Sequence, residues 1–287
     1  MPEITYFSPC KEKIMLESQM KNLKLNYHML EYCNYRCKFC FARYARKEHL
    51  AYSEMHSLIM KIAQSGIFSA INFAGGEPFL IDELPELVRY AKRQGLETSV
   101  ITNGLLLTEE KLRQLLPYLD CIGMSFHSMD DDTKRKVGFC GSGGLVLSNE
   151  KLTEIIGFIE NNSKCQIKIN TVVNAFNKEE ILMPFIQDLQ IDRWKILRCQ
   201  PFGNNDEMLI SDDDWNLFCE RNKGVAHTVF ESTMEDTYIM VNPQGMLLKE
   251  AENGKSYEEI GSFLECDVKE LLFKHPLRME KYTNRYS

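Results

Sequence analysis

Residues 33–40 read CNYRCKFC, and this stretch decides how the rest of the chain is interpreted. Three intervening residues separate Cys33 from Cys37, and two separate Cys37 from Cys40. Three thiols at this spacing can wrap one face of a [4Fe–4S] cube and leave its fourth iron without a protein ligand, although such clusters normally take four cysteines. The alternatives are a zinc site that lacks a ligand, or three buried thiols. A zinc knuckle would need a second pair such as CxxC or HxxxH, and none follows, so the stretch favours an iron–sulfur centre.

The motif resembles the signature of radical S-adenosylmethionine (SAM) enzymes, including the aromatic Phe39 before the last cysteine. In that family the open iron binds the amino and carboxylate groups of SAM, and the reduced cluster cleaves SAM to a 5′-deoxyadenosyl radical. The resemblance therefore implies a [4Fe–4S] cluster and SAM as cofactors, with Cys33, Cys37 and Cys40 as the metal ligands.

Composition is that of an ordinary soluble globular protein. The 287 residues are 44% apolar and 26% charged, which suits one barrel-type domain or two small ones. Residues 1–22 have no apolar core for export, and no run approaches the ~20 apolar residues that cross a bilayer. Ten cysteines without an export signal indicate a reducing compartment, and a net charge of −7 argues against nucleic-acid binding. We expect a cytoplasmic protein with no membrane and no nucleic-acid partner.

Short β-branched or apolar runs alternate with amphipathic stretches along most of the chain. Such alternation predicts parallel strands with right-handed crossovers. After about Pro201 the rhythm changes to a helix near 212–221 and a hairpin over 238–249. Ser53 and Thr108 are candidate N-caps of helices. Candidate strands cover 25–30, 70–74, 97–102, 121–126, 165–173 and 194–200, and candidate helices cover 53–65, 82–94, 108–116, 148–161 and 178–189.

Six strand–helix units are too few for a complete eight-stranded barrel. They predict an α/β fold, the partial (β/α)6 TIM-type barrel of radical SAM enzymes, with a C-terminal extension. The expected division is an N-terminal segment at 1–23, the barrel at 24–201, and at 202–287 an extension that closes the substrate site.

In such folds the catalytic groups lie at the carboxyl ends of strands. Residues 75–78, Gly-Gly-Glu-Pro, end the second predicted strand, where glycines let the backbone come close to a ligand. The third and fourth predicted strands also end in polar residues, although such residues are common in ordinary turns. By resemblance to radical SAM enzymes, the SAM-binding residues are Gly75, Gly76, Glu77, Pro78, Thr102, Asn103 and Ser125.

Cationic side chains follow one face of the fifth and sixth predicted strands. Period-two alternation separates Lys168 and Asn170 from the apolar residues between them, and does the same for Arg193 and Lys195. In a barrel these polar faces point into the lumen, where burying unpaired cations costs several kcal/mol each. Either carboxylates pair with them or an anionic ligand does. We favour a phosphate cradle over the alternative, a solvated Arg193 with Lys168 paired to a glutamate.

Several motifs together resemble the viperin family: CNYRCKFCF, INFAGGEPFL, KIN, NAFN and RWK, in the family's order and over about residues 25–238. Viperins are antiviral radical SAM enzymes that abstract the ribose 4′-hydrogen of a nucleoside triphosphate and form its 3′-deoxy-3′,4′-didehydro analogue, a chain terminator. The resemblance implies a flavodoxin- or ferredoxin-like electron donor. It also implies triphosphate and ribose binding by Lys168, Asn170, Arg193 and Lys195, and a late hydrogen donation by Tyr238.

Three departures from the animal members stand out. Ala70 replaces a phosphate-binding lysine, and Gly138-Phe139-Cys140 replaces a Gly-Arg-Gly whose arginine helps to hold SAM. The N-terminus has no membrane-binding amphipathic helix, so the chain looks like a soluble prokaryotic member.

The rival hypotheses are a radical SAM reaction on another substrate, such as a peptide, and a non-enzymatic iron–sulfur redox sensor. The nucleobase stays open.

Overall fold

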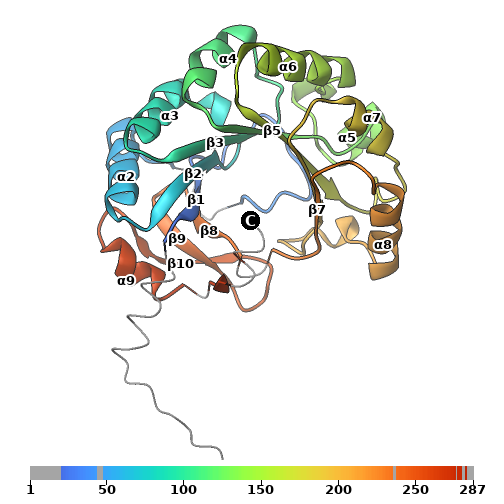
Figure 1. Cartoon of the computed structure of the whole chain (residues 1–287). Coiled ribbons are helices and arrows are strands. Elements are labelled where there is room, and N and C mark those ends of the chain that lie inside the picture. Colours follow the sequence, from blue (N-terminus) through green and yellow to red (C-terminus); the bar gives the residue numbers. More distant parts are fainter. Residues whose placement is uncertain (1–20, 44–47, 235–236, 276, 280–281, 283–287) are drawn as a thin grey trace, which may run out of the picture.

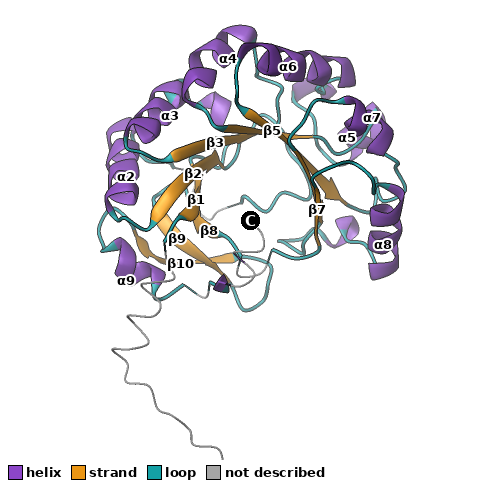
Figure 2. Ribbon diagram, viewed as in Figure 1, coloured by secondary structure: helices purple, strands orange, loops and turns teal. Residues whose placement is uncertain are grey.

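The computed structural model describes residues 21–43, 48–234, 237–275, 277–279 and 282. Most of the predicted N-terminal segment, residues 1–20, lies outside this range. The predicted strand–helix alternation is present, and it forms one curved sheet with helices on its outer side (Figure 1). Figure 2 shows the strands in an arc around an open centre, with no helix on the inner side in this view.

The sheet has ten strands in the order β10-β9-β8-β1-β2-β3-β4-β5-β6-β7. All neighbours from β8 through β1 to β7 run parallel, whereas β9 is antiparallel to β8 and to β10. The edges β10 and β7 are not paired with each other, so the barrel is open. The strands are β1 (Leu23–His28), β2 (Phe68–Ala74), β3 (Glu97–Thr102), β4 (Cys121–Ser125), β5 (Gln166–Val173), β6 (Arg193–Arg198), β7 (Thr228–Glu231), β8 (Ile239–Val241), β9 (Met246–Glu250) and β10 (Tyr257–Ser262).

The helices pack on the outer side and carry the crossovers. Their bounds are α2 (Tyr52–Gln64), α3 (Leu84–Arg93), α4 (Glu109–Leu115), α5 (Asp131–Lys136), α6 (Asn149–Asn162), α7 (Met183–Asp188), α8 (Asp212–Arg221) and α9 (Val268–Leu272). The six predicted strands are present, with ends shifted by one or two residues. The strands β7 and β10 and the helices α5 and α9 were not predicted.

Two helix starts differ from the prediction. Thr108 caps α4 as expected, but Ser53 does not cap α2, whose N-cap is Ala51. The Ala51 N–H instead donates to the Glu54 carboxylate at 2.8 Å. The predicted helix at 178–189 is shorter, because residues 175–179 form turns and α7 begins beside Pro184. Proline suits a first helical turn and disfavours helix before it.

The apolar core lies between the sheet and its helices. Trp194 and Ile196 of β6 are fully buried there, as the alternation predicts, and the Trp194 indole N–H donates to the Thr171 hydroxyl at 2.9 Å. The intervening residues of the strand face inward. The core therefore holds the outer faces, and the inner face of the sheet is left polar.

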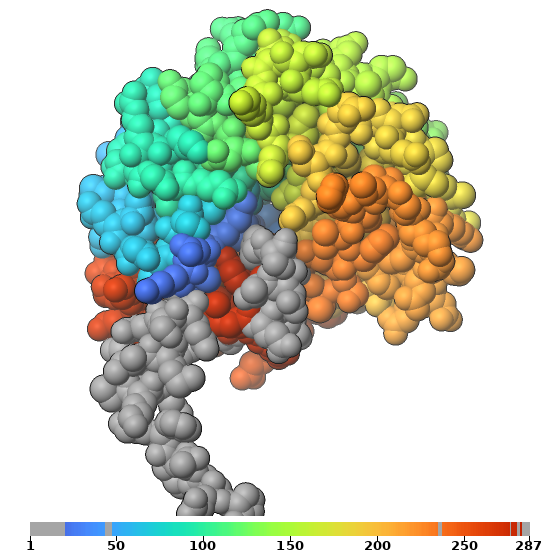
Figure 3. Space-filling view, viewed as in Figure 1, coloured from blue at the N-terminus to red at the C-terminus, as the bar shows by residue number. Residues whose placement is uncertain are grey.

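The C-terminal strands belong to the same sheet as the barrel, because β8 pairs directly with β1. Figure 3 shows the first described residues, in blue, beside the C-terminal part, in red. Within the described ranges, no helix is long and apolar enough to span a membrane.

Candidate active site

One large cavity of about 540 Å³ occupies the inside of the barrel. It is lined by residues from both predicted groups, those at the carboxyl ends of the strands and those on the cationic faces of β5 and β6. Glu77 and Pro78 are the two predicted residues that do not line it. The predicted residues that do are Cys33, Cys37, Cys40, Gly75, Gly76, Thr102, Asn103, Ser125, Lys168, Asn170, Arg193, Lys195 and Tyr238.

The cysteine loop follows β1 and is held by backbone hydrogen bonds rather than by regular structure. On one side the Gly76 N–H donates to the Leu30 carbonyl at 2.6 Å. On the other side the Arg36 N–H donates to the Gly138 carbonyl at 3.1 Å, and the Lys38 N–H donates to that of Val137 at 2.9 Å. The loop is thus fixed between two distant segments of the chain.

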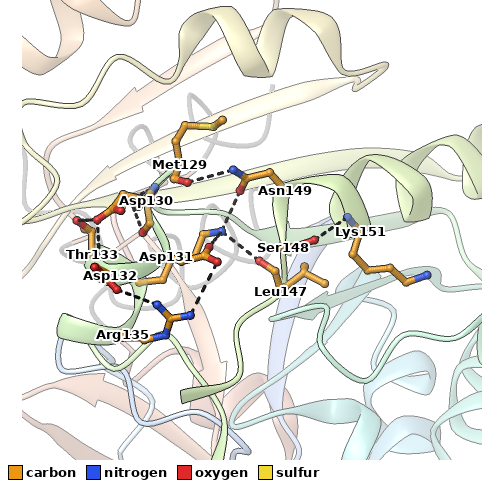
Figure 4. A network of polar contacts seen from close by, with 12 residues as sticks. Met129, Asp130, Asp131, Asp132, Thr133, Arg135, Leu147, Ser148, Asn149 and Lys151 are labelled. Carbon is orange, nitrogen blue, oxygen red and sulfur yellow. Dashed lines mark hydrogen bonds and ion pairs between the residues drawn. The ribbon is translucent and has the colours of Figure 1, made fainter. Parts of the chain in front are cut away.

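A polar network behind the loop fixes one of those segments. The fully buried Lys134 ammonium of α5 bonds Asp131 at 2.9 Å, Asn149 at 2.9 Å and the Leu147 carbonyl at 3.1 Å. Figure 4 shows how this network joins α5 to the start of α6. Helix α5 ends just before Val137. The network therefore fixes the position of Val137 and Gly138, whose carbonyls accept the hydrogen bonds from the cysteine loop.

The three thiols of Cys33, Cys37 and Cys40 face the same cavity and are free. Burial raises the pKa of Cys33 to about 11. The pKa of Cys37 is also raised, mainly by burial and to a smaller extent by the neighbouring Cys40 and Cys33. Across the described part of the chain, no three His, Cys, Asp or Glu side chains are arranged to hold one metal ion. Three partly buried thiols that face one cavity fit an iron–sulfur cluster, which would supply the positive charge that thiolates need there.

The glycine turn after β2 is required by close approach to the cysteine loop. Gly75 has φ +119°, and a Cβ on it would lie 2.6 Å from the Leu30 carbonyl oxygen. A Cβ on Gly76 would lie 1.9 Å from the Tyr32 carbonyl oxygen. Both distances are far below a van der Waals contact, so only glycine lets this turn pack where it does.

Glu77 is fully buried and links the ends of β2 and β3. Its carboxylate accepts hydrogen bonds from the Phe79 N–H at 3.1 Å, the Thr102 hydroxyl at 2.7 Å and the Asn103 N–H at 2.9 Å. Burial raises the pKa of Glu77 to about 7, although these three hydrogen bonds act to lower it. Asn103 in turn donates to the Asn34 side chain at 2.7 Å. Glu77 therefore positions Thr102 and Asn103, and through Asn103 the cysteine loop.

An aromatic stack occupies the place of the arginine that the resemblance implied. Phe139 is buried and contacts Tyr35 and His127 edge to face, with ring centroids 4.9 and 4.5 Å apart. The His127 Nδ1 accepts the Val172 N–H at 3.0 Å, and burial lowers the pKa of His127 to about 3. His127 is thus a neutral, hydrogen-bonded wall of the cavity.

The cationic faces of β5 and β6 are in register, with Lys168 opposite Arg193 and Asn170 opposite Lys195. Lys168 has no carboxylate partner among the residues that the structure describes, so the alternative of a glutamate partner is wrong there. Burial, followed by the nearby Lys195, lowers the pKa of Lys168 to about 7. Lys168 is therefore a buried amine whose charged form no described carboxylate balances.

Lys195 differs from its neighbours because protein groups already hold it. Its ammonium lies 2.6 Å from the Glu231 carboxylate and donates to the Tyr238 hydroxyl at 2.8 Å. The Tyr238 hydroxyl lies 3.4 Å from the other Glu231 oxygen. Glu231 was missed in the sequence because its strand, β7, was not predicted.

Comparison with known proteins agrees with this geometry. The model of the radical SAM superfamily matches residues 27–145. A protein of Selenomonas ruminantium named S-adenosylmethionine-dependent nucleotide dehydratase is 36% identical, over 92% of this chain and 98% of that protein. One of the same name from Pseudoalteromonas ulvae is 31% identical, over 94% of each. The chain belongs to the viperin family of S-adenosylmethionine-dependent nucleotide dehydratases.

Solved radical SAM structures share the fold of this viperin-family chain. Streptococcus suis SuiB bound to S-adenosylmethionine has a TM-score of 0.71 at 15% identity, covering 99% of this chain and 75% of that one. The structure of anSMEcpe with bound AdoMet has a TM-score of 0.65 at 16% identity, covering 91% and 82%. The predicted partial barrel is confirmed.

Proposed function

We propose that the protein is a radical SAM enzyme that converts a ribonucleoside triphosphate to its 3′-deoxy-3′,4′-didehydro analogue. The observation that carries the proposal is the single cavity that joins the three-thiol loop to a face of cations. A redox sensor would need only the first feature. The nucleotide dehydratase names of the relatives agree with the second.

The cavity residues suit the two cofactors of the family. Cys33, Cys37 and Cys40 would hold a [4Fe–4S] cluster, and the turn at 75–78 with Thr102, Asn103 and Ser125 would hold SAM. Within that set we assign Glu77 a positioning role, because its carboxylate already accepts three hydrogen bonds from residues at the ends of β2 and β3. When bound and reduced, the cluster and SAM supply the radical that takes the ribose 4′-hydrogen; this chemistry belongs to the cofactors.

The protein's own contribution is to bind and orient the nucleotide. The cations of β5 and β6 would hold its phosphates, and Asn170 would bind its ribose. Remote phosphate-binding energy is thereby spent on placing one ribose carbon correctly, which can lower a barrier by several kcal/mol. The 4′-hydrogen would leave on 5′-deoxyadenosine and the 3′-hydroxyl as water, and a further electron and a proton from the same donor system and solvent would complete a product lighter by the elements of water. Tyr238 is the candidate for late hydrogen donation.

The remaining assignments follow from the same reaction. A flavodoxin- or ferredoxin-like protein would supply the electron, and the cytoplasm is the expected location. The expected product is an antiviral chain terminator. Residues 202–287 would close the substrate site, since Tyr238 lines the cavity from that part of the chain.

An anaerobic assay tests the function. Reconstituted protein is mixed with SAM, dithionite and each of the four ribonucleoside triphosphates, and 5′-deoxyadenosine and nucleotide products are read by mass spectrometry. We expect 5′-deoxyadenosine to depend on one triphosphate, with a product lighter by one water, and the Cys40→Ala variant to make neither. SAM cleavage that ignores every nucleotide would point to another substrate, such as a peptide. Absence of SAM cleavage in fully iron-loaded protein would favour a redox sensor.

A further inference from the structure

A fourth cation lies in the cavity on a strand that the phosphate prediction did not include. Lys24 of β1 lines the cavity together with Asn26 and His28, whereas Leu25 and Tyr27 between them are buried in the core. The alternation of β1 thus directs the Lys24 side chain to the same interior as Lys168, Arg193 and Lys195.

The neighbouring strand leaves room for this side chain. Lys24 is in register with Ala70 of β2, and Ala70 also lines the cavity. Its methyl group offers neither a charge nor a hydrogen bond. Lys24 therefore supplies the only charged side chain at this pair of positions.

The Lys24 ammonium has no carboxylate within ion-pair distance among the described residues. It makes no ion pair or hydrogen bond there, and the same holds for Lys168 and the Arg193 guanidinium. Burial lowers the pKa of Lys24; Cys121 and Glu97 act in the opposite direction, and the nearby Lys195 and Arg193 lower it again. Four cations from three strands thus repel one another across one cavity, and among the described residues only Lys195 is paired, with Glu231.

We propose that Lys24 is a phosphate ligand, the fourth cation of the triphosphate pocket, acting from the first strand across the small Ala70. The inference rests on the proposed function, since it extends the same pocket. A polyphosphate carries enough charge to neutralise the unpaired cations, and charge-assisted contacts to phosphate are among the strong ones.

The competing explanation is local. Glu97 begins β3, lines the cavity and is in register with Ala70, and its negative charge acts on Lys24. Lys24 could then serve only to neutralise Glu97. Removing the Glu97 charge in the Lys24→Ala background separates the two roles, because a lysine that only neutralises Glu97 becomes dispensable once that charge is gone.

The experiment measures binding of inorganic tripolyphosphate and of the four ribonucleoside triphosphates by calorimetry, without turnover. The proteins are wild type, Lys24→Ala, the swap Lys24→Ala/Ala70→Lys, and Lys164→Ala as an exposed lysine control. We expect Lys24→Ala to weaken binding roughly 10- to 100-fold, the swap to restore most of it, and the control to bind as wild type. SAM affinity, measured in parallel, should stay within about twofold in all four.

The outcomes are distinguishable. If wild type binds triphosphates and Lys24→Ala binds them equally well, the inference is overturned and the proposed function stands. A loss in Lys24→Ala that disappears in the double variant Lys24→Ala/Glu97→Gln would assign Lys24 to Glu97 instead. If wild type binds no triphosphate at all, the proposed function itself fails.

Discussion

The two ends of the cavity are built on opposite principles. At the carboxyl ends of β2 and β3, the buried Glu77 carboxylate is satisfied within the protein by three hydrogen bonds. On the faces of β1, β5 and β6, cations such as Lys168 and Arg193 face the cavity without carboxylate partners among the described residues. The Glu77 network is complete before any ligand arrives, whereas we propose that the cationic end is completed by its ligand.

This difference indicates what each end contributes. A radical centre needs fixed geometry, so its supports are rigid and intolerant of change. A phosphate pocket needs charge, and clustered cations destabilise the fold until an anion binds them. Substitutions at the first end should therefore cost stability, whereas neutralising a cation at the second should gain stability and lose binding.

The largest effect is expected from Gly76→Ala. The new methyl group would lie 1.9 Å from the Tyr32 carbonyl oxygen, and backbone cannot move aside as a flexible side chain can. We expect the cysteine loop to be displaced, iron incorporation to fall to a small fraction, and the free energy of unfolding to drop by about 3 kcal/mol. Iron and sulfide per chain after anaerobic reconstitution, with urea denaturation of the apoprotein, measure this.

Gly157→Ala is the matched control. Gly157 lies inside α6, and a Cβ there would meet nothing within 4 Å. Alanine in a helix interior should stabilise by up to about 1 kcal/mol and leave iron content unchanged. Full iron loading of Gly76→Ala would mean that the turn does not hold the loop.

The next effect concerns Glu77→Gln. An amide can keep only one acceptor oxygen, so its NH2 group would face the N–H of Asn103 or of Phe79 in a buried site. We expect a loss of about 1–3 kcal/mol in the free energy of unfolding and weaker SAM binding. Thermal and urea denaturation test this against Glu160→Gln, an exposed carboxylate whose loss should change stability little. Equal stability of both variants would remove the positioning role of Glu77.

The sequence predicted the parts of the fold that depend on local pattern. Strand–helix alternation located β1–β6, and the cysteine spacing located the loop. Long-range pairing was not readable: nothing in residues 239–241 indicates that β8 joins β1, and β7 with Glu231 was missed. Because the first strand was predicted to begin at 25, two residues late, Lys24 was left out, and the pocket was interpreted as lacking a cation at Ala70. Side-chain direction in the turn was equally inaccessible, which is why Glu77 was grouped with residues that line the cavity.

At the charged end, Lys168→Met should stabilise the apoprotein. The pKa of Lys168 is lowered to about 7 from the ~10.4 of an unperturbed lysine, so between these values the unfolded chain binds more protons. The cost of burying the charge is therefore complete below pH 7 and fades as the pH rises toward 10. Lys168→Met should gain on the order of 1 kcal/mol at pH 6.5 and less at pH 9.5, measured by urea denaturation. A loss of stability at pH 6.5 would contradict this.

The same lysine gives triphosphate binding a proton signature. An anion raises the pKa of Lys168, so at pH 8 binding should take up part of a proton in wild type and less in Lys168→Met. Calorimetry in two buffers of different ionisation enthalpy measures the uptake. Identical uptake in both proteins would show that Lys168 does not meet the phosphates.

The smallest structural effect is expected from Tyr238→Phe, which removes a hydroxyl between the two ends of the cavity. Lys195 keeps Glu231 at 2.6 Å when its 2.8 Å contact with Tyr238 is lost, so stability should fall by no more than about 1 kcal/mol. The chemical effect should be larger than the structural one. A late hydrogen donor is needed only after the 4′-hydrogen has gone, so a nucleotide deuterated at the 4′-carbon should still give deuterated 5′-deoxyadenosine while the didehydro product falls away.

Two measurements decide between donation and positioning. If the hydroxyl only orients Lys195, Tyr238→Phe should weaken triphosphate binding, and product per SAM cleaved should stay normal once nucleotide is saturating. If it donates hydrogen, binding should hold while product per SAM cleaved falls. Tyr90→Phe, on the outer helix α3, controls for the loss of a hydroxyl and should change neither quantity. Normal product yield from Tyr238→Phe at saturation would make this tyrosine part of the proposed phosphate end, where Glu231 and Tyr238 together hold Lys195.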